Sequence, residues 1–166
     1  MSYRRLSGRV SPAAIGRRTF RKVPDTSSKK NEMIYHIVIE ADYRSRNDGQ
    51  QYIPADFAAA GFVHCALEVS VLPVANDYYA AVSDTLLLLR IDPTRLKSPT
   101  RYEAASPARA AGTSHVATSP VFPHVYGPID NAAIDGIGIL TKGEHGYVWP
   151  TGFRSIAEYL GRSAGG

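Results

Sequence analysis

The segment Ile34-Tyr35-His36-Ile37-Val38-Ile39 decides the fold of this 166-residue chain. It consists of β-branched, aromatic and other apolar residues around one histidine, and charged residues lie on both sides of it. Such a run predicts a strand that is mostly buried. We therefore expect a folded domain that begins near Met33 and holds His36 inside its first strand.

Several further segments predict strands. Residues 85–91 form an apolar run closed by Asp92-Pro93, which is typical of a central strand followed by a turn. Shorter strands are predicted at Phe62-Val63-His64-Cys65, 101–103, 134–141 and 146–149. The stretch Phe122-Pro123-His124-Val125-Tyr126-Gly127-Pro128 is expected to be rigid and aromatic.

Helices are fewer and shorter. Residues 54–60, with Pro54 first and Gly61 behind, predict a short helix. A longer helix is expected within residues 67–82, where Pro73 would kink it or move its start. Residues 42–51 are polar, with a turn at Asn47-Asp48-Gly49. Strands that do not alternate regularly with helices predict one small α+β domain, with a mixed or split sheet and few short helices.

The two ends of the chain differ from this domain in composition. Residues 1–30 hold nine Lys and Arg against one acid, Asp25, although the net charge of the whole chain is only +4. The high isoelectric point therefore belongs to the tail. We expect a disordered basic tail at 1–31, a domain at 33–150 and a C-terminal extension at 151–166. Residues 104–120 lack periodicity and predict a long mobile loop.

The basic tail has three interpretations. It could be a targeting peptide, a basic arm that contacts polyanions, or a start assigned too early, with Met33 as the true initiator. We favour the third interpretation or a solvated tail, because Pro12 and Gly16 weaken the amphipathic helix that targeting requires. Nucleic acid is not an expected partner except through this tail.

Composition also limits the compartment and the chemistry. No apolar run approaches the roughly 20 residues that span a bilayer, so no membrane partner is expected. Cys65 is the single cysteine, which excludes an intrachain disulfide and a thiolate zinc cage. A cytoplasmic location fits best, with organelle targeting through residues 1–31 as the alternative. Cys65 itself is expected to be a small core residue.

Histidine provides the main functional signal. Three of the five histidines, His36, His64 and His124, lie in segments predicted to be ordered. An imidazole titrates near neutral pH, so it can transfer a proton, bind a ribose hydroxyl or ligate a metal. For any one of them alone, a hydrogen-bonded histidine in or near the core is the simpler interpretation. We predict that separate segments bring the three histidines into one cleft.

Other polar and aromatic residues could complete such a site. Glu103 ends a predicted strand, where its carboxylate can face a cleft, although a solvated strand end is the simpler interpretation. Several tyrosines could stack on a ring or simply line the core edge, namely Tyr52, Tyr78, Tyr79, Tyr102 and Tyr126. No sequence-local metal motif, phosphate-binding glycine loop or nucleophile elbow is present. A zinc site made by His36, His64 and His124 together stays open as an alternative.

The order of five segments resembles the family catalogued as domain of unknown function 952. These segments are residues 33–38, 61–65, 88–93, 101–103 and 122–128. The resemblance spans residues 33–150 and leaves the tail outside it. Two positions depart from the pattern, because Ala66 replaces an expected serine and Ser70 an expected glutamine. The motif order is also remotely similar to the ADP-ribosyltransferase superfamily, in the branch with histidines on the first two core strands.

That second resemblance implies a mechanism. His36 would hold the nicotinamide ribose hydroxyls and His64 would line the nicotinamide side of the pocket, with Phe62 beside it. Tyr52 or Tyr126 would stack on a ring, and Glu103 or His124 would orient the acceptor. NAD would then be a substrate, and no resident cofactor is identified.

Three functions are therefore expected as candidates. The first is an ADP-ribosyltransferase-like protein that binds NAD or a related nucleotide. The second is a non-catalytic module that binds a small molecule or a protein, which the substitutions Ala66 and Ser70 make credible. The third is a zinc-dependent hydrolase that uses the three histidines. Whether the protein is an enzyme is left open by the sequence.

Overall fold

A computed structural model describes residues 32–104 and 121–161. The predicted first strand is β1 (Ile34–Ile39), and it pairs antiparallel with β4 (Leu86–Ile91). The sheet continues through β8 (Ile134–Gly143) to β9 (Gly146–Val148), in the order β1-β4-β8-β9. The strand predictions for these four segments are confirmed.

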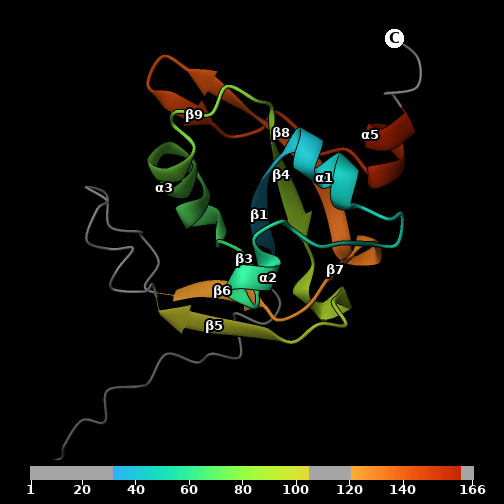
Figure 1. Cartoon of the computed structure of the whole chain (residues 1–166). Helices are drawn as coiled ribbons and strands as arrows, with labels where there is room; N and C mark the ends of the chain where they lie inside the picture. Colours follow the sequence, from blue (N-terminus) through green and yellow to red (C-terminus); the bar gives the residue numbers. More distant parts are fainter. Residues whose placement is uncertain (1–31, 105–120, 162–166) are drawn as a thin grey trace, which may run out of the picture.

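A second sheet has the order β3-β6-β5 and is also antiparallel. It consists of β3 (Val63–His64), β5 (Thr100–Ala104) and β6 (Val121–Val125). Figure 1 shows β5 and β6 crossing one end of the first sheet. The two sheets are joined directly, because Tyr35 and Ala66 form a bridge between β1 and the residues that follow β3.

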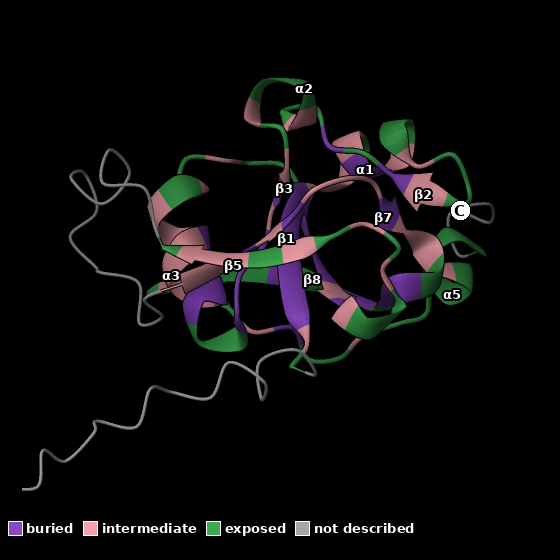
Figure 2. Cartoon of the chain, turned by 90° about the horizontal axis from the view of Figure 1, so that it is seen from below, coloured by how far each residue is buried: buried purple, intermediate pink, exposed green. Residues whose placement is uncertain are grey.

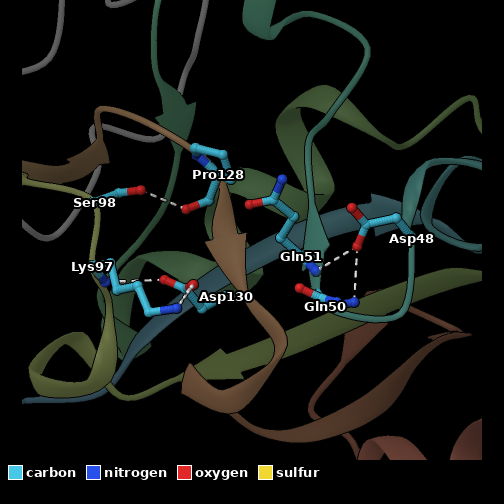
Figure 3. A network of polar contacts seen from close by, with 7 residues as sticks. All are labelled: Asp48, Gln50, Gln51, Lys97, Ser98, Pro128 and Asp130. Carbon is cyan, nitrogen blue, oxygen red and sulfur yellow. Dashed lines mark hydrogen bonds and ion pairs between the residues drawn. The ribbon is translucent and has the colours of Figure 1, made fainter.

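A third, two-stranded sheet consists of β2 (Gln51–Tyr52) and β7 (Ile129–Asp130). The turn that leads into β2 is organised by Asp48. Its carboxylate accepts hydrogen bonds from the backbone N–H groups of Gln50 and Gln51, at 2.8 and 2.7 Å (Figure 3). A carboxylate that bonds the backbone in this way is typical of an Asx turn.

Side-chain bonds then fix the segment before β5 against β7 and the residue that precedes it. Asp130 accepts a hydrogen bond from the backbone N–H of Lys97 at 3.0 Å and pairs with its ammonium at 3.4 Å. The Ser98 hydroxyl donates to the carbonyl of Pro128 at 2.7 Å (Figure 3). These contacts hold the chain just after Tyr126 in a defined place.

The helices are short and lie around the sheets. Their bounds are α1 (Glu40–Arg46), α2 (Phe57–Ala60), α3 (Glu68–Tyr78) and α5 (Ile156–Gly161). The longest, α3, packs against β1 and β9 (Figure 1). It contains Pro73, which therefore lies inside the helix rather than at its start. Two 3-10 turns, Pro93–Arg95 and Asn131–Ala133, follow β4 and β7.

The core explains why the strands read as continuous apolar runs. Along β4, Leu87 and Leu89 belong to one buried cluster and Leu86 and Leu88 to another, so this strand is covered on both faces. Figure 2 shows the middle of the first sheet, around the β1 and β8 labels, in the colour of buried residues. A strand buried on both faces shows no polar alternation. The predicted single small α+β domain is confirmed.

The segment after Pro150 packs onto the domain. Tyr159 on α5 is buried in the core cluster that contains Leu87, and its hydroxyl donates to Glu40 on α1 at 2.5 Å. Arg154 forms a β-bridge with Ile137 on β8. The first residues of the predicted C-terminal extension are thus joined to the same core as the strands.

The main difference from the sequence prediction is α1, which occupies residues expected to be irregular. Two ion pairs with helical spacing stabilise it, Glu40 with Arg44 and Asp42 with Arg46. Ala104, assigned to the long loop, ends β5 instead. The predicted tail at 1–31 and the remaining loop residues lie outside the described residues. Within the described ranges, no helix has the length and apolar character of a membrane span.

Candidate functional site

The β3-β6-β5 sheet presents one apolar face and one polar, aromatic face. His64 lies opposite His124, and His124 lies opposite Arg101, so these three side chains share a face. Val63 and Val125 form the alternate pair and are fully buried in the core. We call the outward set the histidine face, and it comprises Phe62, His64, Arg101, Glu103, His124 and Tyr126.

The centre of the histidine face is the carboxylate of Glu103. One of its oxygens, Oε2, lies 2.7 Å from Nδ1 of His124 and accepts a hydrogen bond from the Tyr126 hydroxyl, also at 2.7 Å. These bonds, the one from Tyr126 first, lower the pKa of Glu103, and in turn the carboxylate raises the pKa of Tyr126. Because an ionised carboxylate only accepts, Nδ1 of His124 carries a hydrogen, and Nε2 is the acceptor of the neutral ring.

Aromatic rings surround this carboxylate. Phe62 stacks on the ring of His124 with centroids 4.1 Å apart, and it meets the rings of His64 and Tyr126 at 4.6 and 5.4 Å. The rings of His64 and His124 are perpendicular, with centroids 5.4 Å apart. The side chain of His124 is only 13% exposed, whereas that of Glu103 is 38% exposed. The histidine is therefore held in place while the carboxylate is open to solvent.

The sequence prediction overlooked Arg101. Its guanidinium lies over the ring of Tyr126, 4.8 Å from the centroid, and the residue is exposed. Arg101 and Glu103 are two residues apart on a strand, so they lie on the same face. That spacing is the signal that could have identified Arg101 from the sequence.

His36 and Tyr52 are not part of the histidine face. His36 is only 7% exposed and belongs to β1, where burial lowers its pKa. Its Nδ1 lies 2.7 Å from the backbone carbonyl of His64, and its ring lies 5.7 Å from that of Tyr52. Tyr52 is fully buried and donates to Asp42 at 3.3 Å. The structure thus brings two of the three predicted histidines together and places the third beneath them.

The arrangement does not provide a set of zinc ligands. Among the residues that the structure describes, no group of three or more His, Cys, Asp or Glu side chains could hold a metal ion. Cys65 is 4% exposed and burial raises the pKa of its thiol, which confirms that it is a core residue.

Two surface hollows lie away from the histidine face. One, of about 230 Å³, is lined by residues of β8 and α5 that include Ile137, Ile139 and Tyr159. The other, of about 280 Å³, lies at the start of α1 and includes Glu40 and Arg44. Neither is lined by a residue predicted to carry chemistry, so the candidate site is a sheet surface rather than either of these hollows.

These features define a small α+β domain with a histidine, glutamate and tyrosine cluster on its second sheet. The chain belongs to the family described as "Protein of unknown function (DUF952)", which matches residues 37–137, more than half of its length. Ala66 and Ser70, the two positions that the sequence resemblance singled out, are both buried: Ala66 lies in the bridge to β1, and Ser70 lies in α3.

One solved structure supports the fold. The chain is similar to the solution NMR structure of protein CC0527 from Caulobacter crescentus, with 19% identity and a TM-score of 0.54, over 77% of this chain and 96% of that one. A crystal structure of the same protein matches with 19% identity and a TM-score of 0.47, over 78% and 98%. No curated protein matches the chain.

Proposed function

We propose that the histidine face binds a nucleotide, and that Glu103 and His124 act there as an acid–base pair. The observation that supports this most strongly is the single carboxylate oxygen of Glu103 shared by His124 and Tyr126, both at 2.7 Å. A carboxylate that orients an imidazole fixes its tautomer and leaves the opposite nitrogen to exchange a proton with a ligand. Nε2 of His124 is that nitrogen.

The side chains around the pair suit a ligand with an aromatic ring and a negative charge. Phe62 and Tyr126 offer ring faces on which a base can stack. Arg101 supplies an exposed guanidinium, which binds phosphate oxygens in a bidentate manner. Aromatic rings beside an exposed guanidinium favour a nucleotide over a neutral sugar or a peptide.

The finer proposal is an ADP-ribosyltransferase-like reaction on NAD. In that reaction the bond between the nicotinamide nitrogen and the ribose carbon breaks, and nicotinamide leaves with the electron pair. An acceptor hydroxyl forms the new bond to the ribose carbon and gives its proton to Nε2 of His124. Glu103 stabilises the imidazolium that results, by the charge-assisted bond to Nδ1.

One observation favours a second candidate, a module that binds without turnover. Phe62 already stacks on His124 at 4.1 Å, so the rings of the histidine face contact one another closely. A tightly packed set of rings can recognise a ligand edge without admitting a reacting group. The two candidates differ in one respect, which is whether bound NAD loses nicotinamide.

Calorimetric titration of the full chain with NAD, ADP-ribose and AMP tests the binding, and chromatography of the NAD mixture tests for released nicotinamide. The variants are Glu103→Gln and His124→Gln. Glu144 and His145 are exposed and adjacent in the turn between β8 and β9, outside the histidine face. The substitutions Glu144→Gln and His145→Gln are therefore matched controls. The proposal predicts saturable binding that both site variants weaken at least tenfold and both controls preserve.

The outcomes are distinct. Binding with release of nicotinamide supports the transferase-like reaction, and binding without release supports the module. No binding of any of the three ligands, or binding that all four variants share equally, contradicts the nucleotide proposal.

A further inference from the structure

We propose that His36 is a positioning residue, which sets His64 against His124 by holding the backbone carbonyl of His64. This inference rests on the proposed function for its consequence in binding, but its geometry can be measured without any ligand. It assigns His36 a role in the interior, instead of the direct ligand contact that the remote transferase resemblance implies.

The hydrogen bond itself defines which ring nitrogen acts. A backbone carbonyl only accepts, so the 2.7 Å contact requires that Nδ1 of His36 carries the hydrogen. Burial lowers the pKa of His36 and favours its neutral form, in which Nε2 is then an acceptor. Nε2 is buried and has no hydrogen-bond partner among the described residues.

The position of β3 depends on few bonds, which is why one side chain can matter. β3 is two residues long and pairs only with β6 within its sheet. The chain then crosses to β1 through two backbone bonds between Tyr35 and Ala66, of 2.9 and 2.8 Å. The bond from His36 to the carbonyl of His64 is a third connection between the same two segments. It acts on the residue whose ring faces His124.

The accessibility of Nε2 distinguishes the two possible roles of His36, which are positioning His64 and contacting a ligand directly. A direct contact with a ligand would use Nε2, which is shielded from solvent in a ring that is 7% exposed and lies 5.7 Å from the buried ring of Tyr52. The existing geometry engages Nδ1 alone. Positioning therefore requires no movement of the core, whereas ligand contact would require it to open.

Two substitutions distinguish these roles. In His36→Asn the side-chain amide nitrogen lies near the place of Nδ1 and can still donate to the carbonyl of His64. In His36→Gln the amide lies near the place of Nε2, and the donor at the Nδ1 position is lost. The first readout is the nuclear Overhauser effect between the rings of His64 and His124 in the free protein. The second is the affinity for ADP-ribose.

We expect His36→Asn to keep the ring-to-ring signal and to bind within about threefold of the wild-type chain, and His36→Gln to lose the signal and bind at least tenfold more weakly. If His36→Asn lost binding of ADP-ribose and His36→Gln retained it, the proposal would be overturned and Nε2 would be assigned to the ligand. Retention of the ring-to-ring signal in both variants would overturn it as well. If the wild-type chain does not bind ADP-ribose, the ring-to-ring signal still decides the positioning role, and only the proposed function fails.

A measurement on the wild-type chain guards against variants that do not fold. Long-range nitrogen–proton correlation of the His36 ring reports its tautomer directly. The proposal requires hydrogen on Nδ1, with a proton shift typical of a hydrogen-bonded imidazole. Hydrogen on Nε2 would contradict it whatever the variants do.

Discussion

His64 and His124 lie directly opposite each other on β3 and β6, and their rings are perpendicular with centroids 5.4 Å apart. This pairing joins segments that are far apart in the chain and gives the second sheet a polar, aromatic face. Glu103 reaches the same face from β5 and bonds to His124. Two antiparallel pairings, β3 with β6 and β5 with β6, therefore assemble most of the candidate site.

The bond from Tyr126 should be visible in the titration of Glu103. It is the largest cause of the lowered pKa of Glu103, so Tyr126→Phe should move that pKa upward, toward the usual range of a carboxyl group. Carbon-detected NMR of the side-chain carboxyl measures this. Glu40 is an internal control, because its lowered pKa depends first on Tyr159. An unchanged pKa of Glu103 would show that the Tyr126 bond is absent in solution.

The close approach of Gly127 to Ser98 should not tolerate a side chain. Gly127 has a φ of +156°, and a Cβ there would collide with the hydroxyl of Ser98, which bonds to Pro128. We expect Gly127→Ala to lower the free energy of unfolding by about 1–3 kcal/mol. Gly152→Ala, where a Cβ would meet nothing within 4 Å, is the control. Denaturant unfolding measures both, and Ser98→Ala should partly relieve the Gly127→Ala defect.

Leu87 and Ile139 provide a matched pair for the core. They lie opposite each other on β4 and β8, but Leu87 is fully buried and Ile139 is 40% exposed. Leu87→Ala should lower the free energy of unfolding by about 2–5 kcal/mol, because it leaves a cavity. Ile139→Ala should change it by about 0.5 kcal/mol. Equal losses in urea unfolding would mean that the side chain of Leu87 is not more deeply buried in solution than that of Ile139.

The bond between Tyr159 and Glu40 should stabilise the domain in a pH-dependent way. The Tyr159 hydroxyl is the first cause of the lowered pKa of Glu40, so its stabilisation is present above the unfolded pKa and is lost as the pH falls through the folded pKa. Tyr159→Phe should cost about 1 kcal/mol at pH 7, since the carboxylate is partly exposed. Unfolding at pH 7 and pH 3 measures this, and a cost that does not shrink at pH 3 would contradict the assignment.

The strands could be predicted because their composition is unambiguous. The run at 34–39 and the four leucines before Arg90 are largely apolar on both faces, and both became buried strands, β4 in the middle of the first sheet and β1 at its edge. The same property hid the direction of His36. Because Ile34 and Tyr35 are both buried, on opposite faces of β1, sequence alternation does not show whether His36 faces the core or an open cleft.

The polar parts were harder to predict. α1 was overlooked because residues 42–51 are polar, although the charges at 40, 42, 44 and 46 have the spacing of helical ion pairs. The pairing of β3 with β6 could not be predicted, since each strand is short and nothing in one sequence selects a distant partner. Without that pairing, His64 and His124 were two candidates instead of one site.

The most direct test of the central claim is nitrogen–proton chemical-shift mapping of the full chain titrated with ADP-ribose. If the histidine face is the nucleotide site, saturable shifts should concentrate at Arg101, Glu103, His124 and their neighbours on β3, and they should disappear in His124→Gln. Saturable shifts confined to the hollow around Ile137 and Tyr159, or no saturable shifts, would contradict the account.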